Sequence, residues 1–129
     1  EEKKEALGLT HYLKADGVEA EFITGESDLI TAAEILKSYG PKEIIITHKD
    51  GVLVFDGDKI YQEPFILNKI IGRSGRGDTC GASYAFKRLT LKPEEAIKWA
   101  AAATSLKMES DSPLKSSYEE IEKRVEQYF

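Results

Sequence analysis

A glycine-rich loop that runs directly into a helical pattern constrains the fold of this chain more than any other feature. The loop and the helix start read Gly72-Arg73-Ser74-Gly75-Arg76-Gly77-Asp78-Thr79-Cys80-Gly81-Ala82. Glycines let backbone amides turn inward without obstruction by a Cβ atom, and a helix N-terminus adds free N–H groups and a positive dipole end. Such a nest of amides holds an anion, most often a phosphate. The alternative is that the glycines serve only a structural turn.

Asp78 indicates which phosphate chemistry the loop suits. Gly72, Gly77 and Thr79 match the spacing G-x-x-x-x-G-K-[ST] of a P-loop, but an aspartate stands where that motif has its lysine. A carboxylate at this position suits a proton acceptor for an attacking hydroxyl, as in the base of a kinase. The alternative is that Asp78 only caps the helix, where Asp is favoured in any case.

At these residues the chain resembles a known family. Gly75-Arg76-Gly77-Asp78-Thr79, followed by Gly81-Ala82, is similar to the signature D-T-x-G-A-G-D in the C-terminal half of ribokinase (PfkB) family carbohydrate kinases. The resemblance implies that Asp78 is the catalytic base and that the amides of Gly75, Arg76 and Gly77 form the anion hole.

Two positions depart from this signature. Gly72 stands where the family has its first Asp, which helps to hold a monovalent cation in cation-activated members, and Arg76 replaces the middle Ala. The variant with two arginines resembles a sub-group of bacterial and archaeal kinases that act on sugars or cyclic polyols.

Asp16 and Glu19 form a second candidate site. They lie three residues apart across a predicted strand-to-helix turn, so both carboxylates can point towards a hydrated cation. The same spacing is a common capping arrangement, and the pattern alone favours the cap. The family carries N-x-x-E here, followed by a helix that ends in T-G, as in Thr24-Gly25. The resemblance therefore implies that Glu19 and Asp16 handle magnesium and phosphate.

The run from Glu43 to Thr47 is β-branched and without alternation, which predicts a central strand buried on both faces. Its end should lie at the carboxyl edge of the sheet, where open α/β folds bind ligands. The family has T-L-G-x-x-G at this place, so the resemblance implies that Thr47 and Gly51 contact the nucleotide phosphates. It also implies an adenine site around Ala101, Ser105 and residues 109–113.

The remaining patterns predict the frame around these residues. We expect a helix end at 2–8, a strand at 12–15, a helix at 18–23, a helix from Ser27-Asp28 to Gly40, a hairpin at 52–62, and a helix after Pro93. The spacing of Ala82, Ala85, Phe86 and Leu89 predicts the buried face of the helix after the loop. A last amphipathic helix, with Tyr118, Ile121, Val125 and Tyr128, should pack against the sheet. These patterns predict an α/β fold. The resemblance implies that it is a three-layer α/β/α sandwich, ribokinase-like (Rossmann-like), with the C-terminal half only.

Composition limits the class of protein. The chain has 129 residues, 41% apolar and 32% charged, with a formal net charge of −5. These values predict one soluble globular domain and argue against nucleic acid as a partner. A single cysteine, Cys80, suits a reducing cytoplasm, and neither a signal peptide nor a membrane-spanning run is evident, so we expect no membrane partner.

These observations predict an ATP-dependent phosphotransferase that uses Mg²⁺ and acts on a hydroxyl of a sugar or cyclic polyol. The matching features belong to the ATP-binding and catalytic half of the family, residues 1–129, whereas the sugar-binding and lid half has no counterpart. A nucleotide-binding fragment without catalytic activity is therefore the alternative. The expected partner is a small-molecule sugar or polyol, and the full-length parent is a possible homo-oligomer.

Overall fold

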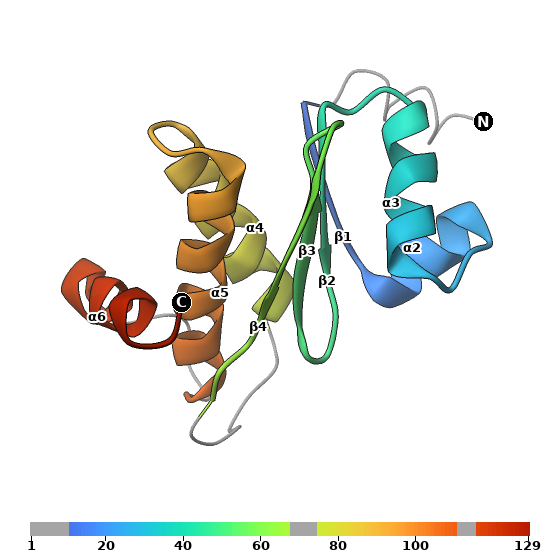
Figure 1. The fold of residues 1–129 in the computed structure, drawn as a ribbon. Coiled ribbons are helices and arrows are strands. Elements are labelled where there is room, and N and C mark those ends of the chain that lie inside the picture. Colours follow the sequence, from blue (N-terminus) through green and yellow to red (C-terminus); the bar gives the residue numbers. More distant parts are fainter. Residues whose placement is uncertain (1–10, 68–74, 111–115) are drawn as a thin grey trace.

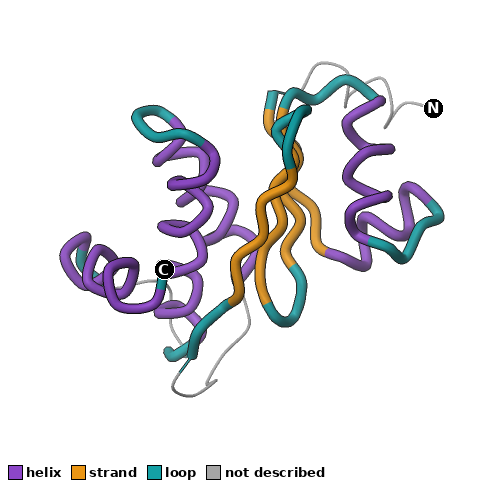
Figure 2. Tube along the Cα trace, in the orientation of Figure 1, coloured by secondary structure: helices purple, strands orange, loops and turns teal. Residues whose placement is uncertain are grey.

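A four-stranded mixed sheet separates two layers of helices (Figures 1 and 2). The computed structural model describes residues 11–67, 75–110 and 116–129, so the helix end expected at 2–8 lies outside the described residues. The strands are β1 (Tyr12–Asp16), β2 (Glu43–Thr47), β3 (Gly51–Phe55) and β4 (Ile60–Pro64), in that spatial order. β1 and β2 are parallel, whereas β2–β3 and β3–β4 are antiparallel.

The helices cover both faces of this sheet. Helices α2 (Gly17–Thr24) and α3 (Leu29–Ser38) lie on one face, and α4 (Arg76–Arg88) and α5 (Pro93–Met108) lie on the other (Figure 1). This arrangement confirms the predicted three-layer α/β architecture. No helix within the described ranges combines the length and the apolar character needed to cross a bilayer.

Helix α6 (Tyr118–Tyr128) lies beyond α5 and not against the sheet (Figure 1). Its buried residue Ile121 packs with Trp99, Ala102 and Ala103 of α5. The prediction that this helix packs on the sheet is therefore wrong. The alanine-rich α5 is buried on the sheet side and on the α6 side, so it occupies the place on the sheet that the prediction assigned to α6.

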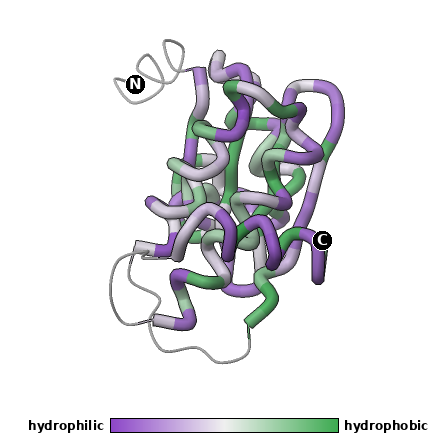
Figure 3. The backbone as a smooth tube through the Cα atoms, turned by 90° about the vertical axis from the view of Figure 1, so that its left-hand side faces the viewer, coloured by the Kyte–Doolittle hydropathy of each residue, from purple (hydrophilic) through white to green (hydrophobic). Residues whose placement is uncertain are grey.

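Alternation along the strands divides the core into two parts. Ile45, Val52 and Val54 face α4 and α5, whereas Ile44, Ile46 and Leu53 face α2 and α3. All five residues of β2 are buried, as expected for a central strand with helices on both faces. Figure 3 shows hydrophobic stretches in the interior and hydrophilic ones mostly at the periphery.

Helix α4 turns a different stripe towards the core than the sequence predicts. Its buried residues are Cys80, Tyr84 and Lys87. The prediction named Ala82, Ala85, Phe86 and Leu89. Phe86 and Leu89 are 56% and 79% exposed, so the predicted face is wrong.

The polar ends of the buried α4 side chains explain this difference. The Tyr84 hydroxyl donates a hydrogen bond to Glu43 Oε2 on β2 at 3.2 Å. The Lys87 ammonium lies over the rings of Trp99 and Tyr118, at 4.7 and 4.3 Å from their centroids. Because partners from distant elements satisfy these groups, both side chains can be buried.

Candidate functional site

A small polar pocket lies where β1 and β2 end and α4 begins. Its volume is about 250 Å³. The lining residues are Lys14, Asp16, Thr47, Gly75, Arg76, Gly77 and Asp78. Three segments that are far apart in the sequence therefore meet at the carboxyl ends of two parallel strands, which is where open α/β sheets bind ligands.

The N-terminus of α4 supplies one wall of this pocket. Gly75 is the N-cap residue, with a left-handed φ of 77° and no side-chain capping bond. The first helical bond runs from the Thr79 N–H to the Gly75 carbonyl at 2.9 Å. The amides that precede it have no acceptor within the helix, because the first turn of any helix lacks them. This glycine-capped turn therefore presents N–H groups and the positive dipole end to the pocket.

Asp78 is the third residue of this helix and does not cap it, so the capping alternative is wrong. Its side chain is 92% exposed, and its Oδ1 lies 3.9 Å from Lys14 Nζ on β1. An exposed carboxylate at the mouth of an amide nest can accept a proton from a hydroxyl placed there.

Thr47 lies at the end of β2 with its side chain fully buried. Within the described part of the chain, its Oγ1 atom has no hydrogen-bond partner. Buried hydroxyls in native proteins are rarely left unpaired, because desolvation without a hydrogen bond is costly. A ligand oxygen or a water in the pocket would satisfy this group.

Asp16 and Glu19 form a complete capping box at the start of α2. Asp16 Oδ1 accepts a hydrogen bond from the Glu19 N–H, and Glu19 Oε2 accepts one from the Asp16 N–H, both at 2.8 Å. Asp16 lines the polar pocket, but Glu19 does not. Across the described residues, no group of three or more His, Cys, Asp or Glu side chains is arranged to hold a metal ion.

The donor set nevertheless fits Mg²⁺ in one respect. This ion usually keeps several waters and binds through one or two carboxylates together with substrate phosphates. Asp16 offers a carboxylate at the pocket, beside the amides that would face a phosphate. The resemblance also implied Glu19, but its carboxylate is turned towards the backbone of Asp16.

A second, larger pocket of about 460 Å³ shares Asp16 and Arg76 with the first. His48 and Lys49, which follow β2, lie on its other side. Burial lowers the pKa of His48, and the Arg76 charge lowers it further, whereas Asp50 raises it. The cationic side chains of Lys49 and Arg76 make this space suitable for a further phosphate.

Three predicted nucleotide contacts lie elsewhere. Ala101 and Ser105 are fully buried in α5, and the Ser105 hydroxyl donates to the Ala101 carbonyl at 2.7 Å and accepts from the Ile66 N–H at 3.0 Å. Neither side chain offers a surface to a nucleotide in this structure. Gly51 is buried at the start of β3, where an added Cβ would lie 2.9 Å from Pro64 Cα, so packing against β4 explains this glycine.

Lys14 is the pocket residue that the sequence did not reveal. It stands between Leu13 and Ala15 on β1, and its ammonium reaches over the start of α4. A lysine within a short strand usually indicates an exposed position, and α4 follows β1 by some sixty residues in the sequence. The only signal was the pair Gly77 and Gly81, one turn apart, which leaves room on α4 for a side chain from another element.

Comparison with known proteins identifies relatives of this chain. Residues 1–119 match the family described as pfkB family carbohydrate kinase. A ribokinase of Lactococcus lactis subsp. lactis (strain IL1403) is 31% identical over 77 residues, which is 59% of this chain and 26% of that protein.

Solved structures agree with the family match. A pyrophosphate-dependent kinase in the ribokinase family, complexed with a pyrophosphate analog and myo-inositol, is 42% identical with a TM-score of 0.82, over 95% of this chain and 44% of that one. A pyrophosphate-dependent myo-inositol-1 kinase, converted into a myo-inositol-3 kinase by two substitutions, is 40% identical with a TM-score of 0.85, over 100% and 47%. A ribokinase from Thermotoga maritima shares the fold, at 23% identity and a TM-score of 0.85, over 96% and 45%.

The chain thus spans less than half the length of these proteins. The family match, in contrast, extends over most of the chain and includes the glycine-capped helix and the strand ends that form the polar pocket. The chain belongs to the pfkB family of carbohydrate kinases.

Proposed function

We propose that this chain binds a phosphoryl donor and, as one half of a longer kinase, transfers the donor's terminal phosphoryl group to a hydroxyl of a sugar or cyclic polyol. One observation carries the proposal: an exposed carboxylate, Asp78, stands at a glycine-capped helix N-terminus, beside the buried Thr47 hydroxyl, which has no hydrogen-bond partner among the residues that the structure describes. The amide nest suits phosphoryl oxygens, and the carboxylate suits the proton of the attacking hydroxyl.

The reaction assigns a task to each of these groups. The substrate oxygen forms a bond to the terminal phosphorus while the bond from that phosphorus to the bridging oxygen breaks, and ADP leaves when ATP is the donor. Asp78 accepts the hydroxyl proton. The amides of Gly75, Arg76 and Gly77 hold the equatorial oxygens, and preorganised donors of this kind are worth about 3–4 kcal/mol each in the best-measured oxyanion hole.

Asp16 is the residue we expect to hold Mg²⁺ through bound water, with Glu19 fixing the turn that presents it. The ion would neutralise charge on the donor phosphates. Thr47 would donate its hydroxyl hydrogen to a phosphate oxygen. The buried hydroxyl would then have a hydrogen-bond partner.

The sequence predicts ATP as the donor, but inorganic pyrophosphate is a second candidate. Two relatives at 40% and 42% identity are pyrophosphate-dependent kinases, and one of them is complexed with myo-inositol. The predicted adenine contacts, Ala101 and Ser105, are buried, whereas the polar pocket adjoins a second pocket at Arg76, and Lys49 also lines that second pocket. Cationic side chains at these two adjoining pockets suit a donor that consists of phosphates alone, in which case phosphate is the leaving group.

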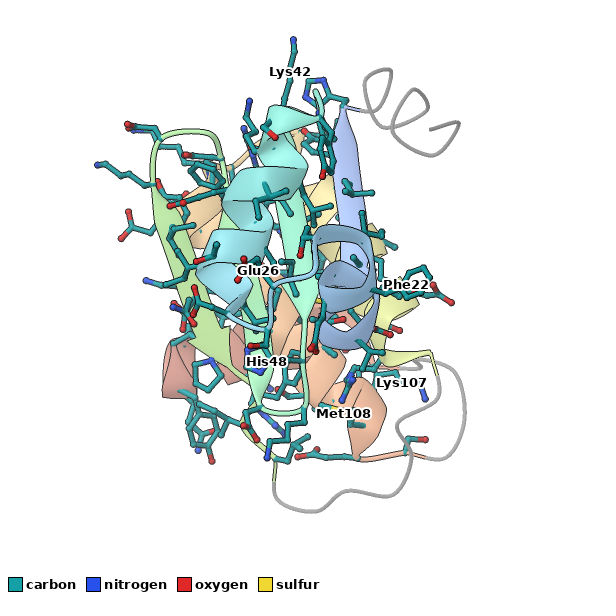
Figure 4. All side chains as sticks on the ribbon, turned by 90° about the vertical axis from the view of Figure 1, so that its right-hand side faces the viewer. Phe22, Glu26, Lys42, His48, Lys107 and Met108 are labelled. Atoms are coloured by element: carbon teal, nitrogen blue, oxygen red, sulfur yellow. The ribbon has the colours of Figure 1, made fainter. Side chains whose placement is uncertain are left out.

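We also propose that this domain is the donor-binding and catalytic half of a longer kinase. An apolar groove of about 480 Å³ runs along β1 and α2, with Leu13, Phe22 and Ile23 among its lining residues. Phe22 is 80% exposed and lies at the rim of the molecule (Figure 4). Exposed apolar surface of this kind is typical of an interface. A chain that lacks its partner half would bind the donor without transferring its phosphoryl group.

Phosphoryl transfer by the full-length kinase that contains this chain, and by its Asp78→Asn variant, tests the proposed function. Each is incubated with Mg²⁺, with ATP or pyrophosphate, and with ribose or myo-inositol, and phosphorus NMR detects the phosphate ester. Donor binding is measured separately by calorimetry. We expect Asp78→Asn to bind the donor and to lose transfer. The asparagine amide has nearly the same shape as the carboxylate, but it is not basic and cannot accept the hydroxyl proton. Transfer that survives this substitution would refute the assignment of the base.

The same assay separates the two classes of function. Donor binding without any ester would identify a binding module. Ester formed from pyrophosphate and not from ATP would identify the donor.

A further inference from the structure

Lys14 enters the polar pocket from β1. Side chains alternate along this strand: Tyr12 packs in the core on the α4 and α5 side, and Leu13 packs on the α2 and α3 side. Lys14 therefore points to the α4 side, and β1 is an edge strand of the sheet. Its side chain is only 32% exposed, so most of it lies against protein.

Two glycines of α4 make the space for this side chain. A Cβ atom at Gly81 would lie 3.0 Å from Lys14 Cγ, and one at Gly77 would lie 2.8 Å from Cε and 2.6 Å from Nζ. The lysine stem thus follows the helix from Gly81 to Gly77 and ends beside the first turn. Any larger residue at Gly77 would displace the ammonium from this position.

Stability does not account for this arrangement. Glycine within a helix is unfavourable relative to alanine. The ion pair that Lys14 makes in return is long, 3.9 Å to an Asp78 carboxylate that is 92% exposed, and pairs of this kind contribute little. Two glycines therefore lower the stability of the helix, and the space they leave places one ammonium group at the helix N-terminus.

The charges around the pocket indicate what the ammonium does there. Asp16 and Asp78 both line the pocket, and each would repel a phosphate. The Lys14 ammonium lies close to both the Asp78 carboxylate and the first turn of the helix, so it offsets that charge where an anion would bind. Thr47 Oγ1, buried and unpaired among the described residues, lies 3.6 Å from the Cβ position of Gly77 and so borders the same space.

We propose that Lys14 binds the oxygens of the transferred phosphoryl group and thereby supplies, from a neighbouring strand, the cation that a P-loop carries on its own helix. The inference rests on the proposed function, because it concerns the same pocket. It accounts for an otherwise unfavourable feature, an aspartate at the position of the P-loop lysine, because the positive charge comes from β1. Lys14 is thus a phosphate-binding residue, whereas Asp78 acts on the hydroxyl.

Binding of inorganic pyrophosphate to this chain tests the proposal. Calorimetry compares the parent with Lys14→Gln, Lys14→Arg and the control Lys42→Gln, and thermal unfolding of each verifies the fold. Lys42 is exposed and lies at the opposite end of the sheet from His48 (Figure 4). We expect Lys14→Gln to weaken binding by about tenfold or more, as the loss of a unit charge at close range implies. Lys14→Arg should retain most of the affinity, and the control should retain all of it.

A footprint provides a readout that a structural role would not change. Amine acylation followed by mass spectrometry should show that pyrophosphate protects Lys14 and leaves Lys42 reactive. Equal affinity of Lys14→Gln and the parent, no protection, or no pyrophosphate binding by the parent would each overturn the proposal. If pyrophosphate binding depends on Lys14 but no ester forms, the role of Lys14 is supported and only the proposed transfer is contradicted. If Lys14→Gln transfers the phosphoryl group as well as the parent does, the proposed transfer is supported and the role of Lys14 is contradicted.

Discussion

Gly77→Ala should separate the stability of this domain from its ability to bind a phosphate. The added methyl group would lie 2.8 Å from Lys14 Cε and 2.6 Å from Nζ, whereas carbon atoms in contact prefer about 3.5–4.0 Å. The lysine end must therefore move by roughly 1 Å, or rotate away from the helix. The backbone of α4 can stay in place, because the contacted atoms belong to the free end of a flexible side chain.

The stability terms nearly cancel. Replacement of glycine by alanine in a helix gains up to about 1 kcal/mol, less in the first turn. Loss of the long Lys14–Asp78 pair costs about 0–1 kcal/mol, since Asp78 is exposed. We expect the free energy of unfolding to change by less than about 1 kcal/mol in either direction, on the sum of these two terms.

The binding term does not cancel. A unit charge displaced from contact with a phosphate costs between about 1 and 4 kcal/mol, for effective dielectric constants of about 80 and 20. Pyrophosphate affinity should therefore fall by about fivefold or more, as measured by calorimetry, while urea unfolding shows a domain of nearly parental stability.

Gly81→Ala is the matched control. Its methyl group would lie 3.0 Å from Lys14 Cγ, which is closer to the backbone and farther from the ammonium. We expect a smaller loss of affinity, because the stem can shift by a few tenths of an ångström while the charge remains at the pocket. Parental affinity in Gly77→Ala, or an equal loss in both variants, would contradict the reasoning.

Two further predictions concern the core. Glu43→Ala should lower the free energy of unfolding by about 3 kcal/mol in urea denaturation, because it leaves Arg88 and the Tyr84 hydroxyl without the buried carboxylate that they share. A loss below about 1 kcal/mol would contradict this prediction and show that water replaces the carboxylate. Burial raises the pKa of the Cys80 thiol to about 12, so between the ordinary thiol pKa of 9.0 and that value the unfolded chain loses a proton that the folded chain keeps. Stability should fall as pH rises through this window, by up to about 1.4 kcal/mol per unit, and Cys80→Ala should show a shallower slope.

Local patterns predicted most of the fold because each element carries its own signal. The unbroken apolar run at 43–47 indicated a buried central strand, and Asp56-Gly57 indicated the turn between β3 and β4. Asp28 marked the start of α3, where its side chain accepts from the Thr31 N–H at 2.9 Å. These signals depend only on neighbours within a few residues, so they do not depend on contacts with distant parts of the chain.

The errors arose where distant partners decide which face is buried. Helix α4 has two stripes with apolar character, and apolarity alone favoured the one with Phe86 and Leu89. Tyr84 and Lys87 are buried instead. Glu43 accepts a hydrogen bond from the Tyr84 hydroxyl, and the Lys87 ammonium lies over two aromatic rings. No periodicity reveals these partners.

The candidate site shows the same division. The amide nest and Asp78 are local features of one helix start, so the sequence alone predicts them. Thr47 follows from the position of β2 in the sheet. The orientation of Lys14 depends on the register of β1 with β2 and on the distance between β1 and α4. The residues next to Lys14 in the sequence predict neither the register nor the distance. What the sequence does hold is the complementary space, two glycines four residues apart at the start of a helix. A pair that weakens a helix on one face therefore indicates that a side chain from another element lies along it, and here that side chain brings a charge to the helix N-terminus.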